Sequence, residues 1–293
     1  MCHPKKTVQH YLNCPSAPPT NYNDTLNRLE VSYYIQAANR VSHWSPVGAP
    51  LSCLNKLKAN IEILRELEIP TRFENRDIGI LIAVNHDRRH IVVAFRSTND
   101  IVQFMTQYLT FALGMMDESP FGGKMNSYYA RAYQDILNYG FDDYLKEDMR
   151  KYLGYSIFVT GHSLGGTLAN IFALHIAMKL GRNDVTVYSW SSPRSGDETF
   201  TQLYHQYVPI AFRIVRDGDF VADLPFRISQ TIPTPHHNGF EIFYQSHMLS
   251  ENYVVCNQPE TEYCLKGQWY KKPVSHMYLF DQNYANYKLG FCE

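Results

Sequence analysis

The chain has 293 residues, which suits one large α/β domain or two small ones. Hydrophobic residues make up 45% and charged residues 19%, so the composition supports a sizeable core and excludes global disorder. Lys and Arg number 27 against 28 Asp and Glu, which excludes a basic surface for nucleic acid and a polybasic anchor for anionic membranes. No apolar run reaches the eighteen or so residues of a transmembrane helix.

Six cysteines and one sequon bear on the cellular compartment. An even cysteine count is compatible with three disulfides and an oxidising compartment, although fifteen pairings are possible. Asn23-Asp-Thr25 is a glycosylation sequon, and the first ten residues contain a basic pair but no apolar signal-peptide core. We therefore expect a secreted protein whose presequence is absent from this chain, with a reduced cytosolic protein as the alternative.

The N-terminal quarter is predicted to contain a surface arm, a loop and two helices. Residues 1–25 are rich in Pro, Asn and Cys and predict an arm on the surface. Apolar residues at helical spacing predict a helix over 26–40. Residues 46–53 are expected to form a loop, and 54–67 another short helix.

Two adjacent strands are expected next, over 78–84 and 90–95. The segment that joins them contains His86-Asp87-x-x-His90, the spacing of a zinc-protease helix with Asp in place of Glu. Its β-branched flanks and polar centre predict a turn, in which the two histidines do not share a face. No metal site is therefore expected there.

From residue 127 onward, helical and strand patterns alternate. Helices are expected at 127–153, at 167–180 and from about 197, the first of them interrupted at Gly140. Strands are expected before Gly161 and at 185–190, 211–216 and 239–244. This alternation predicts an α/β fold with a mostly parallel central sheet flanked by helices. Without an internal repeat or linker, residues 1–293 are expected to form a single domain.

Residues 161–165, Gly-His-Ser-Leu-Gly, match the nucleophile-elbow pattern G-x-S-x-G between an expected strand and an expected helix. The serine of such an elbow occupies a sharp turn with a strained backbone, and the glycines let strand and helix touch. The following helix directs its N-terminus at an anion formed on a substrate that Ser163 attacks. The alternative is a plain glycine-rich turn. His162 must point away from the nucleophile and is expected to be structural.

A serine nucleophile needs a histidine base and a carboxylate that orients the base, which follow it in the order acid, then histidine, in α/β-hydrolases. The expected strand at 211–216 runs into three acids between which periodicity does not choose: Asp217, Asp219 and Asp223. The downstream histidines are His236, His237, His247 and His276. His276 is favoured because it lies in an expected loop just before an apolar run.

Several segments together resemble the class 3 triacylglycerol lipases of the filamentous-fungal type. Besides the elbow, 192–197 (S-P-R-S-G-D) is similar to G-x-P-R-V-G-[DN], and 237–244 resembles H-x-G-x-E-x-[WY], whose histidine is not catalytic in that family. Residues 218–225 resemble the acid segment D-x-V-P-x-L-P and select Asp219, and 275–280 resemble H-L-x-Y-F and select His276. The resemblance implies an α/β-hydrolase fold, a helical lid over the active site and a catalytic triad of Ser163, His276 and Asp219.

The resemblance also implies how the oxyanion is held. Residues 95–98 resemble F-R-G-[ST], in which the Ser/Thr, here Thr98, supplies one donor. The backbone N–H of Leu164 supplies the other, and loss of one such donor costs about 3 kcal/mol. Ser97 stands where the family has glycine, which would cost about 1–2 kcal/mol if the backbone required a positive φ there.

Five apolar residues recur at helical spacing in the next segment: Ile101, Phe104, Met105, Tyr108 and Leu109. The simpler interpretation is a core-facing helix. The family interpretation is a lid whose apolar face covers the cleft in water and turns onto a lipid surface. Exposing about 300 Å² costs up to about 7 kcal/mol in water and little at an oil interface, so the lid would couple activity to the interface.

Two cysteine pairings follow from the resemblance and from position. Cys256 and Cys264 flank a short polar loop and resemble a disulfide of the family. Cys292 is expected to tie down the N-terminal region through one of three partners: Cys2, Cys14 or Cys53.

Taken together, the sequence predicts a monomeric lipase that hydrolyses acylglycerols at a lipid–water interface. It is expected to need no metal or cofactor, to bind no nucleic acid and to have no transmembrane anchor. A phospholipase A1 or a feruloyl-type esterase of the same fold is the alternative within the same chemistry. A catalytically silent lipid-binding homologue is the alternative outside it.

Overall fold

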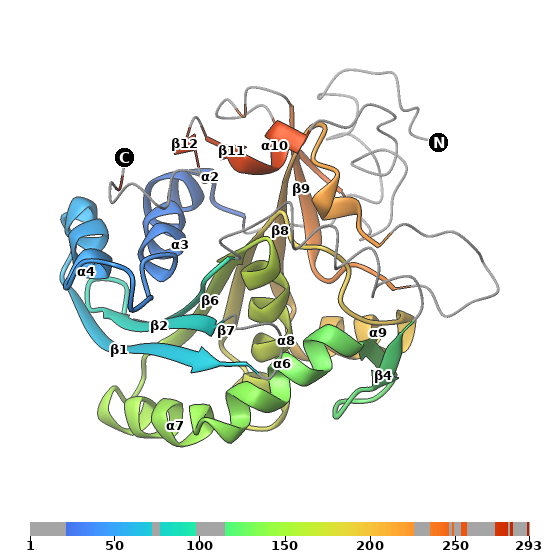
Figure 1. Cartoon of the computed structure of the whole chain (residues 1–293), viewed down its shortest axis with the longest axis horizontal. Helices are drawn as coiled ribbons and strands as arrows, with labels where there is room; N and C mark the ends of the chain where they lie inside the picture. The colour runs from blue at the N-terminus through green and yellow to red at the C-terminus, as the bar shows by residue number, and fades with distance from the viewer. Residues whose placement is uncertain are drawn as a thin grey trace.

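The computed structural model describes residues 22–71, 77–97, 115–225, 235–245, 248, 253–256, 273–280, 282–283 and 292. An eight-stranded sheet with the order β1-β2-β3-β6-β7-β8-β9-β10 runs through the centre (Figure 1). Strands β3, β6, β7, β8 and β9 are parallel to one another, whereas β1 and β2 at one edge and β10 at the other pair antiparallel. The mostly parallel central sheet predicted from the sequence is confirmed.

The strands of this sheet are β1 (Ile61–Pro70), β2 (Asp77–Asn85), β3 (His90–Phe95), β6 (Ser156–His162), β7 (Val185–Trp190), β8 (Ile210–Arg216), β9 (Phe240–Tyr244) and β10 (Tyr253–Val255). Two small antiparallel pairs lie outside it: β4 (Met116–Glu118) with β5 (Lys124–Asn126), and β11 (Tyr278–Leu279) with β12 (Gln282–Asn283). The α-helices are α2 (Asp24–Leu26), α3 (Ser32–Ala38), α4 (Ala49–Leu54), α6 (Ser127–Asn138), α7 (Phe141–Lys151), α8 (Leu164–Met178), α9 (Glu198–Tyr207) and α10 (Pro273–Met277). A π-helical turn, η1 (Asn27–Val31), joins α2 to α3, and 3₁₀ turns form η2 (Asn55–Leu57) and η3 (Val221–Asp223).

Both faces of the sheet are covered, so most side chains of β2 and β3 are buried whichever face they are on. Side chains of β2 alternate between two cores: Ile80 and Ile82 pack into the core beneath α6, α7, α8 and α9, and Leu81 and Ala83 into the core shared with α3 and α4. Figure 1 shows α3 and α4 well separated from α6 and α7. Within the described ranges, no helix is both long enough and apolar enough to cross a bilayer.

The prediction of a helix over 54–67 is wrong. The chain forms the short helix α4, a single 3₁₀ turn and then β1, which pairs along its length with β2. Apolar residues at 54, 57, 61 and 64 have helical spacing but belong to three different elements, α4, η2 and β1. Within β1 the register shifts between Ile63 and Arg65. This irregularity moves the next apolar side chains to the other face of the sheet, where Leu67 and Ile69 are buried. The loop expected over 46–53 is likewise replaced from Ala49 by α4.

The helix expected over 127–153 is interrupted where the sequence predicts. Helix α6 ends at Asn138 and α7 begins at Phe141, with Gly140 between them at a φ of +98°. A left-handed residue at a helix end favours glycine because it has no Cβ.

The last described residue, Cys292, is tied to helix α4. Cys53 and Cys292 form a disulfide with a Cα–Cα distance of 5.3 Å, which selects Cys53 among the three partners considered for Cys292. Residues 1–21, most of the predicted arm, lie outside the described ranges. Tyr22 packs onto the sheet, with its ring centroid 5.6 Å from that of Tyr188.

Candidate active site

The nucleophile elbow stands between β6 and α8. Ser163 has φ 57° and ψ −124°, a strained backbone for a residue with a side chain. A Cβ on Gly161 would lie 2.3 Å from the carbonyl oxygen of Gly165, and one on Gly165 would lie 2.4 Å from the carbonyl oxygen of Phe95. Only glycine at both positions therefore lets β6, α8 and β3 approach this closely.

Three side chains from distant parts of the chain meet at this elbow. His276 Nε2 lies 2.9 Å from the Oγ of Ser163, and its Nδ1 lies 3.0 and 3.1 Å from the two carboxylate oxygens of Asp219. All three side chains are buried. Ser163 follows β6, Asp219 follows β8 and His276 lies on α10, so strand ends at one edge of the parallel sheet position Ser163 and Asp219.

The carboxylate of Asp219 is held by the chain around it. Its Oδ1 accepts hydrogen bonds from the backbone N–H groups of Val221 (3.0 Å) and Ala222 (3.3 Å), at the start of η3. Burial by itself raises the pKa of Asp219, but His276 and the Ala222 amide hold the pKa of this carboxyl below its usual value. An ionised Asp219 fixes the proton of the imidazole on Nδ1 and leaves Nε2 free to accept one from Ser163.

The other acids considered from the sequence lie elsewhere. Asp223 pairs with Arg194 at 3.0 Å, and Arg194 also donates to the carbonyl oxygen of Pro225 at 2.9 Å. The Pro-Arg motif at 193–194 therefore fixes the loop that carries Asp219. Asp217 donates its backbone N–H to the carbonyl oxygen of Tyr244.

The remaining downstream histidines do not join the site as described. His236 forms a bridge with Gly196, to whose carbonyl oxygen its backbone N–H donates. His237 is buried in the same turn before β9. His247 lies outside the described ranges.

His162 is closer to the site than the sequence suggested. Its Nε2 lies 3.0 Å from the backbone carbonyl oxygen of His276, and the two ring centroids are 4.7 Å apart. Its side chain therefore reaches both the backbone and the ring of the predicted base. Only its adjacency to the nucleophile signals this contact in the sequence.

Part of the predicted oxyanion site is described. Leu164 is the first residue of α8, where backbone N–H groups have no partner within the helix. Thr98 and all five predicted lid residues lie outside the described ranges. Ser97 is not among the described non-glycine residues with positive φ, so the strain considered for this position does not arise. Its N–H and hydroxyl instead approach Asn39 Oδ1 at 2.9 and 3.1 Å.

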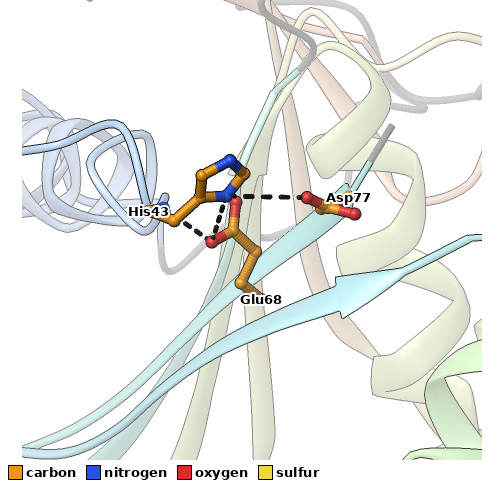
Figure 2. Close-up of side chains that lie close together, drawn as sticks. All are labelled: His43, Glu68 and Asp77. Atoms are coloured by element: carbon orange, nitrogen blue, oxygen red, sulfur yellow. Dashed lines mark hydrogen bonds and ion pairs between the residues drawn. The ribbon is translucent and has the colours of Figure 1, made fainter. Parts of the chain in front are cut away.

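A second cluster of titratable groups lies at the turn after α3 (Figure 2). His43 Nδ1 is 3.0 Å from Glu68 Oε2 and 3.9 Å from Asp77 Oδ2. The guanidinium of Arg96 lies 3.4 Å from the same Glu68 carboxylate and disfavours a cation there. We interpret the cluster as an ion-pair contact that ties this turn to β1 and β2.

The pair of histidines with zinc-protease spacing forms the predicted turn. Residues 86–89 are a turn between β2 and β3, and His86 Nδ1 lies 3.2 Å from the Tyr155 hydroxyl. His90 instead stacks on Phe158, with ring centroids 5.7 Å apart. The two imidazoles thus have different neighbours.

Residues 92–229 match the family described as Lipase (class 3), a range that contains most of β3, the elbow and Asp219. This part of the chain, a little under half of its length, is similar to class 3 lipases. It is 27% identical over 221 residues to the lipase ZK262.3 of Caenorhabditis elegans (67% of this chain, 61% of that protein). It is also 27% identical over 240 residues to a lipase of Rhizomucor miehei (79% and 60%), so the chain spans about three fifths of the length of these relatives.

A solved structure shows the same fold as this chain. The Rhizomucor miehei triacylglyceride lipase superposes with a TM-score of 0.72 at 19% identity, covering 92% of this chain and 99% of that one. The predicted α/β-hydrolase fold is confirmed. Cys256 is buried and disulfide-bonded, but Cys264 lies outside the described ranges, so their pairing stays a prediction.

Proposed function

We propose that this protein hydrolyses the carboxylic esters of acylglycerols through Ser163, His276 and Asp219. The observation that carries the proposal is the distance of 2.9 Å between His276 Nε2 and Ser163 Oγ, with Asp219 on the opposite nitrogen of the ring. A hydroxyl at hydrogen-bond distance from an oriented imidazole is the arrangement that nucleophilic acyl transfer requires.

The reaction proceeds through an acyl-enzyme. Ser163 Oγ attacks the ester carbonyl carbon as its proton moves to His276 Nε2, and the negative oxygen is held by the N–H of Leu164 and by Thr98. His276 then gives the proton to the departing alkoxide, which leaves as the alcohol. A water then gives a proton to His276 and attacks the acyl carbon. His276 returns this proton to Ser163 Oγ as the acyl–oxygen bond breaks, which releases the carboxylic acid and restores the free serine. This cycle uses no metal or cofactor.

The substrate class rests on the relatives. The Rhizomucor miehei protein is a triacylglyceride lipase, and its fold extends over nearly the whole of both chains. The segment 101–109, with its helical apolar spacing, supports action at a lipid–water interface. A phospholipase A1 and a soluble-ester esterase use the same three side chains, so the substrate panel below separates them.

We also propose a secreted monomer. The disulfide between Cys53 and Cys292 supports an oxidising compartment, and Asn23 of the sequon is exposed. Size-exclusion chromatography with light scattering tests the monomer, for which a mass near 34.0 kDa is expected before any glycan is counted.

The function is tested in two steps. A fluorescent alkyl phosphonate is expected to label Ser163 in the wild type and not in Ser163→Ala, whereas an unlabelled wild type would indicate a lipid-binding homologue. Hydrolysis rates are then compared on emulsified tributyrin, phosphatidylcholine vesicles and a soluble p-nitrophenyl ester. Tributyrin is expected to be cleaved fastest, with a rise in rate above its solubility limit. Undiminished hydrolysis by Ser163→Ala would refute the proposal.

A further inference from the structure

We propose that His162 is a positioning residue for His276: its ring N–H holds the backbone of the base against the strand that carries the nucleophile. The inference rests on the proposed function and adds a fourth side chain to the three that the mechanism uses. His162 is the last residue of β6 and directly precedes Ser163, and its side chain is buried.

The hydrogen bond fixes both its partners. A carbonyl oxygen only accepts, so His162 Nε2, at 3.0 Å from the His276 oxygen, carries a hydrogen and donates it. His162 is therefore the Nε2–H tautomer when neutral. Because residues 162 and 163 are neighbours in the chain, this bond ties the backbone of the base to the backbone of the nucleophile.

Helix α10 needs such a tie because it spans only five residues, Pro273–Met277. A helix of this length does not hold its shape by its own hydrogen bonds, so tertiary contacts set the position of His276. On the side-chain end Asp219 holds the ring. The backbone carbonyl oxygen of His276 accepts the hydrogen bond from His162.

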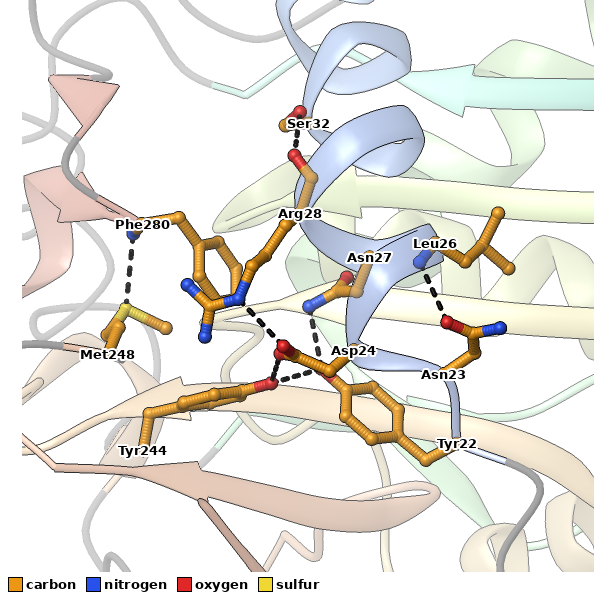
Figure 3. A network of polar contacts seen from close by, with 10 residues as sticks. All are labelled: Tyr22, Asn23, Asp24, Leu26, Asn27, Arg28, Ser32, Tyr244, Met248 and Phe280. Carbon is orange, nitrogen blue, oxygen red and sulfur yellow. Dashed lines mark hydrogen bonds and ion pairs between the residues drawn. The ribbon is translucent and has the colours of Figure 1, made fainter. Parts of the chain in front are cut away.

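The segment after the base is anchored separately, as Figure 3 shows. The Arg28 guanidinium lies over the ring of Phe280 at 4.5 Å and pairs with Asp24 at 2.8 Å. The backbone N–H of Phe280 donates to the sulfur of Met248 at 3.4 Å. These contacts do not involve His162. Removing its bond is therefore expected to shift His276 relative to Ser163 without unfolding α10.

His162 also suits its place electrostatically. Burial, together with positive charge on His276, lowers the pKa of His162 to about 3, against a smaller opposing effect of Asp219. A neighbour that stays neutral neither competes for the proton of Ser163 nor repels the imidazolium that forms on His276 during each transfer.

The alternative is that His162 only fills space in the core. Three variants separate the two roles. His162→Phe keeps an aromatic ring beside His276 but has no donor, whereas the side-chain amide of His162→Gln can still donate to the His276 oxygen. His175→Phe is the matched control, because His175 is also buried and hydrogen-bonded, 2.7 Å from Asp142, but lies eleven residues along α8 from Leu164, about 16 Å.

We expect His162→Phe to lower kcat on a soluble ester by about 10- to 100-fold, with KM within about twofold, and His162→Gln to recover most of kcat. His175→Phe is expected to lower the Tm as much as His162→Phe and to leave kcat unchanged. Wild-type kcat in folded His162→Phe, or an equal loss of kcat in His175→Phe, would overturn the inference. The inactivity of Ser163→Ala, measured in parallel, keeps this outcome distinct from failure of the proposed function.

A measurement on the wild type does not depend on the folding of any variant. Nitrogen-15 NMR of the histidine rings is expected to show His162 as the neutral Nε2–H tautomer from pH 5 to pH 8. An Nδ1–H tautomer, or titration of this ring within that range, would refute the hydrogen bond on which the inference stands.

Discussion

Replacing Asp219 with asparagine tests the choice among three neighbouring acids and the physical role of the one chosen. Oδ1 of residue 219 accepts from the Val221 and Ala222 N–H groups, so the asparagine oxygen is expected to stay there. Its NH₂ then takes the place of Oδ2, 3.1 Å from His276 Nδ1, beside the retained oxygen at 3.0 Å. The negative charge that favours a proton on Nδ1 is gone, and the NH₂ donates to an unprotonated Nδ1. The variant therefore favours the Nε2–H tautomer, in which Nε2 no longer accepts a proton from Ser163.

The size of the effect follows from that tautomer. The corresponding substitution in serine proteases lowers kcat by about 10⁴, which is about 5.4 kcal/mol of barrier at 1.36 kcal/mol for each factor of ten. We expect a loss of this order in Asp219→Asn, with KM little changed. Initial rates on a soluble p-nitrophenyl ester, with circular dichroism to confirm folding, measure it.

Two neighbouring acids supply the controls. Asp217→Asn is expected to keep wild-type kcat. Asp223→Asn weakens the pair with Arg194 and is expected to lower stability more than kcat. An Asp219→Asn enzyme within tenfold of the wild type, or an equal loss in Asp223→Asn, would refute the assignment.

Stability against pH gives a second readout for Asp219. Its pKa is lower in the folded than in the unfolded chain, so its ionised form stabilises the fold above about pH 4. This contribution is lost as the pH falls through the folded-state pKa. The difference in unfolding free energy between wild type and Asp219→Asn is therefore expected to shrink in acid, and urea titrations at pH 7 and pH 3 measure it.

Three further changes test the frame around the site. Gly165→Ala places a Cβ 2.4 Å from a backbone oxygen and is expected to lower kcat by about 10² and stability by about 1–3 kcal/mol; wild-type kinetics would contradict the elbow packing. Glu241→Gln breaks the buried ion pair with Arg213 and is expected to cost about 3–5 kcal/mol in urea titrations, while kcat per folded molecule stays unchanged. Cys53→Ser opens the disulfide to Cys292 and is expected to cost about 2–5 kcal/mol, and dithiothreitol should then lower the Tm of the wild type more than that of the variant.

Much of the architecture can be predicted from patterns among residues that are close in sequence. The alternation of strands and helices predicts the parallel sheet, and glycines at 161 and 165 predict the elbow, because each depends on residues close in sequence. The left-handed Gly140 between α6 and α7 is another local signal. The local pattern fails where contacts distant in sequence determine the secondary structure. Residues 61–67 are predicted to be helical, but they pair with β2 and form a strand with an irregular register.

The sequence by itself predicted Ser163 as the nucleophile, because the elbow needs small residues at fixed spacing, and predicted the order in which the acid and the histidine follow it. It left Asp217, Asp219 and Asp223 equivalent without a family resemblance, since all three follow the same strand. Only the tertiary structure places one carboxylate against His276 and sets His162 behind the base. Those contacts join residues up to 114 positions apart. Patterns among neighbouring residues cannot predict them, because such residues meet only when the whole chain folds.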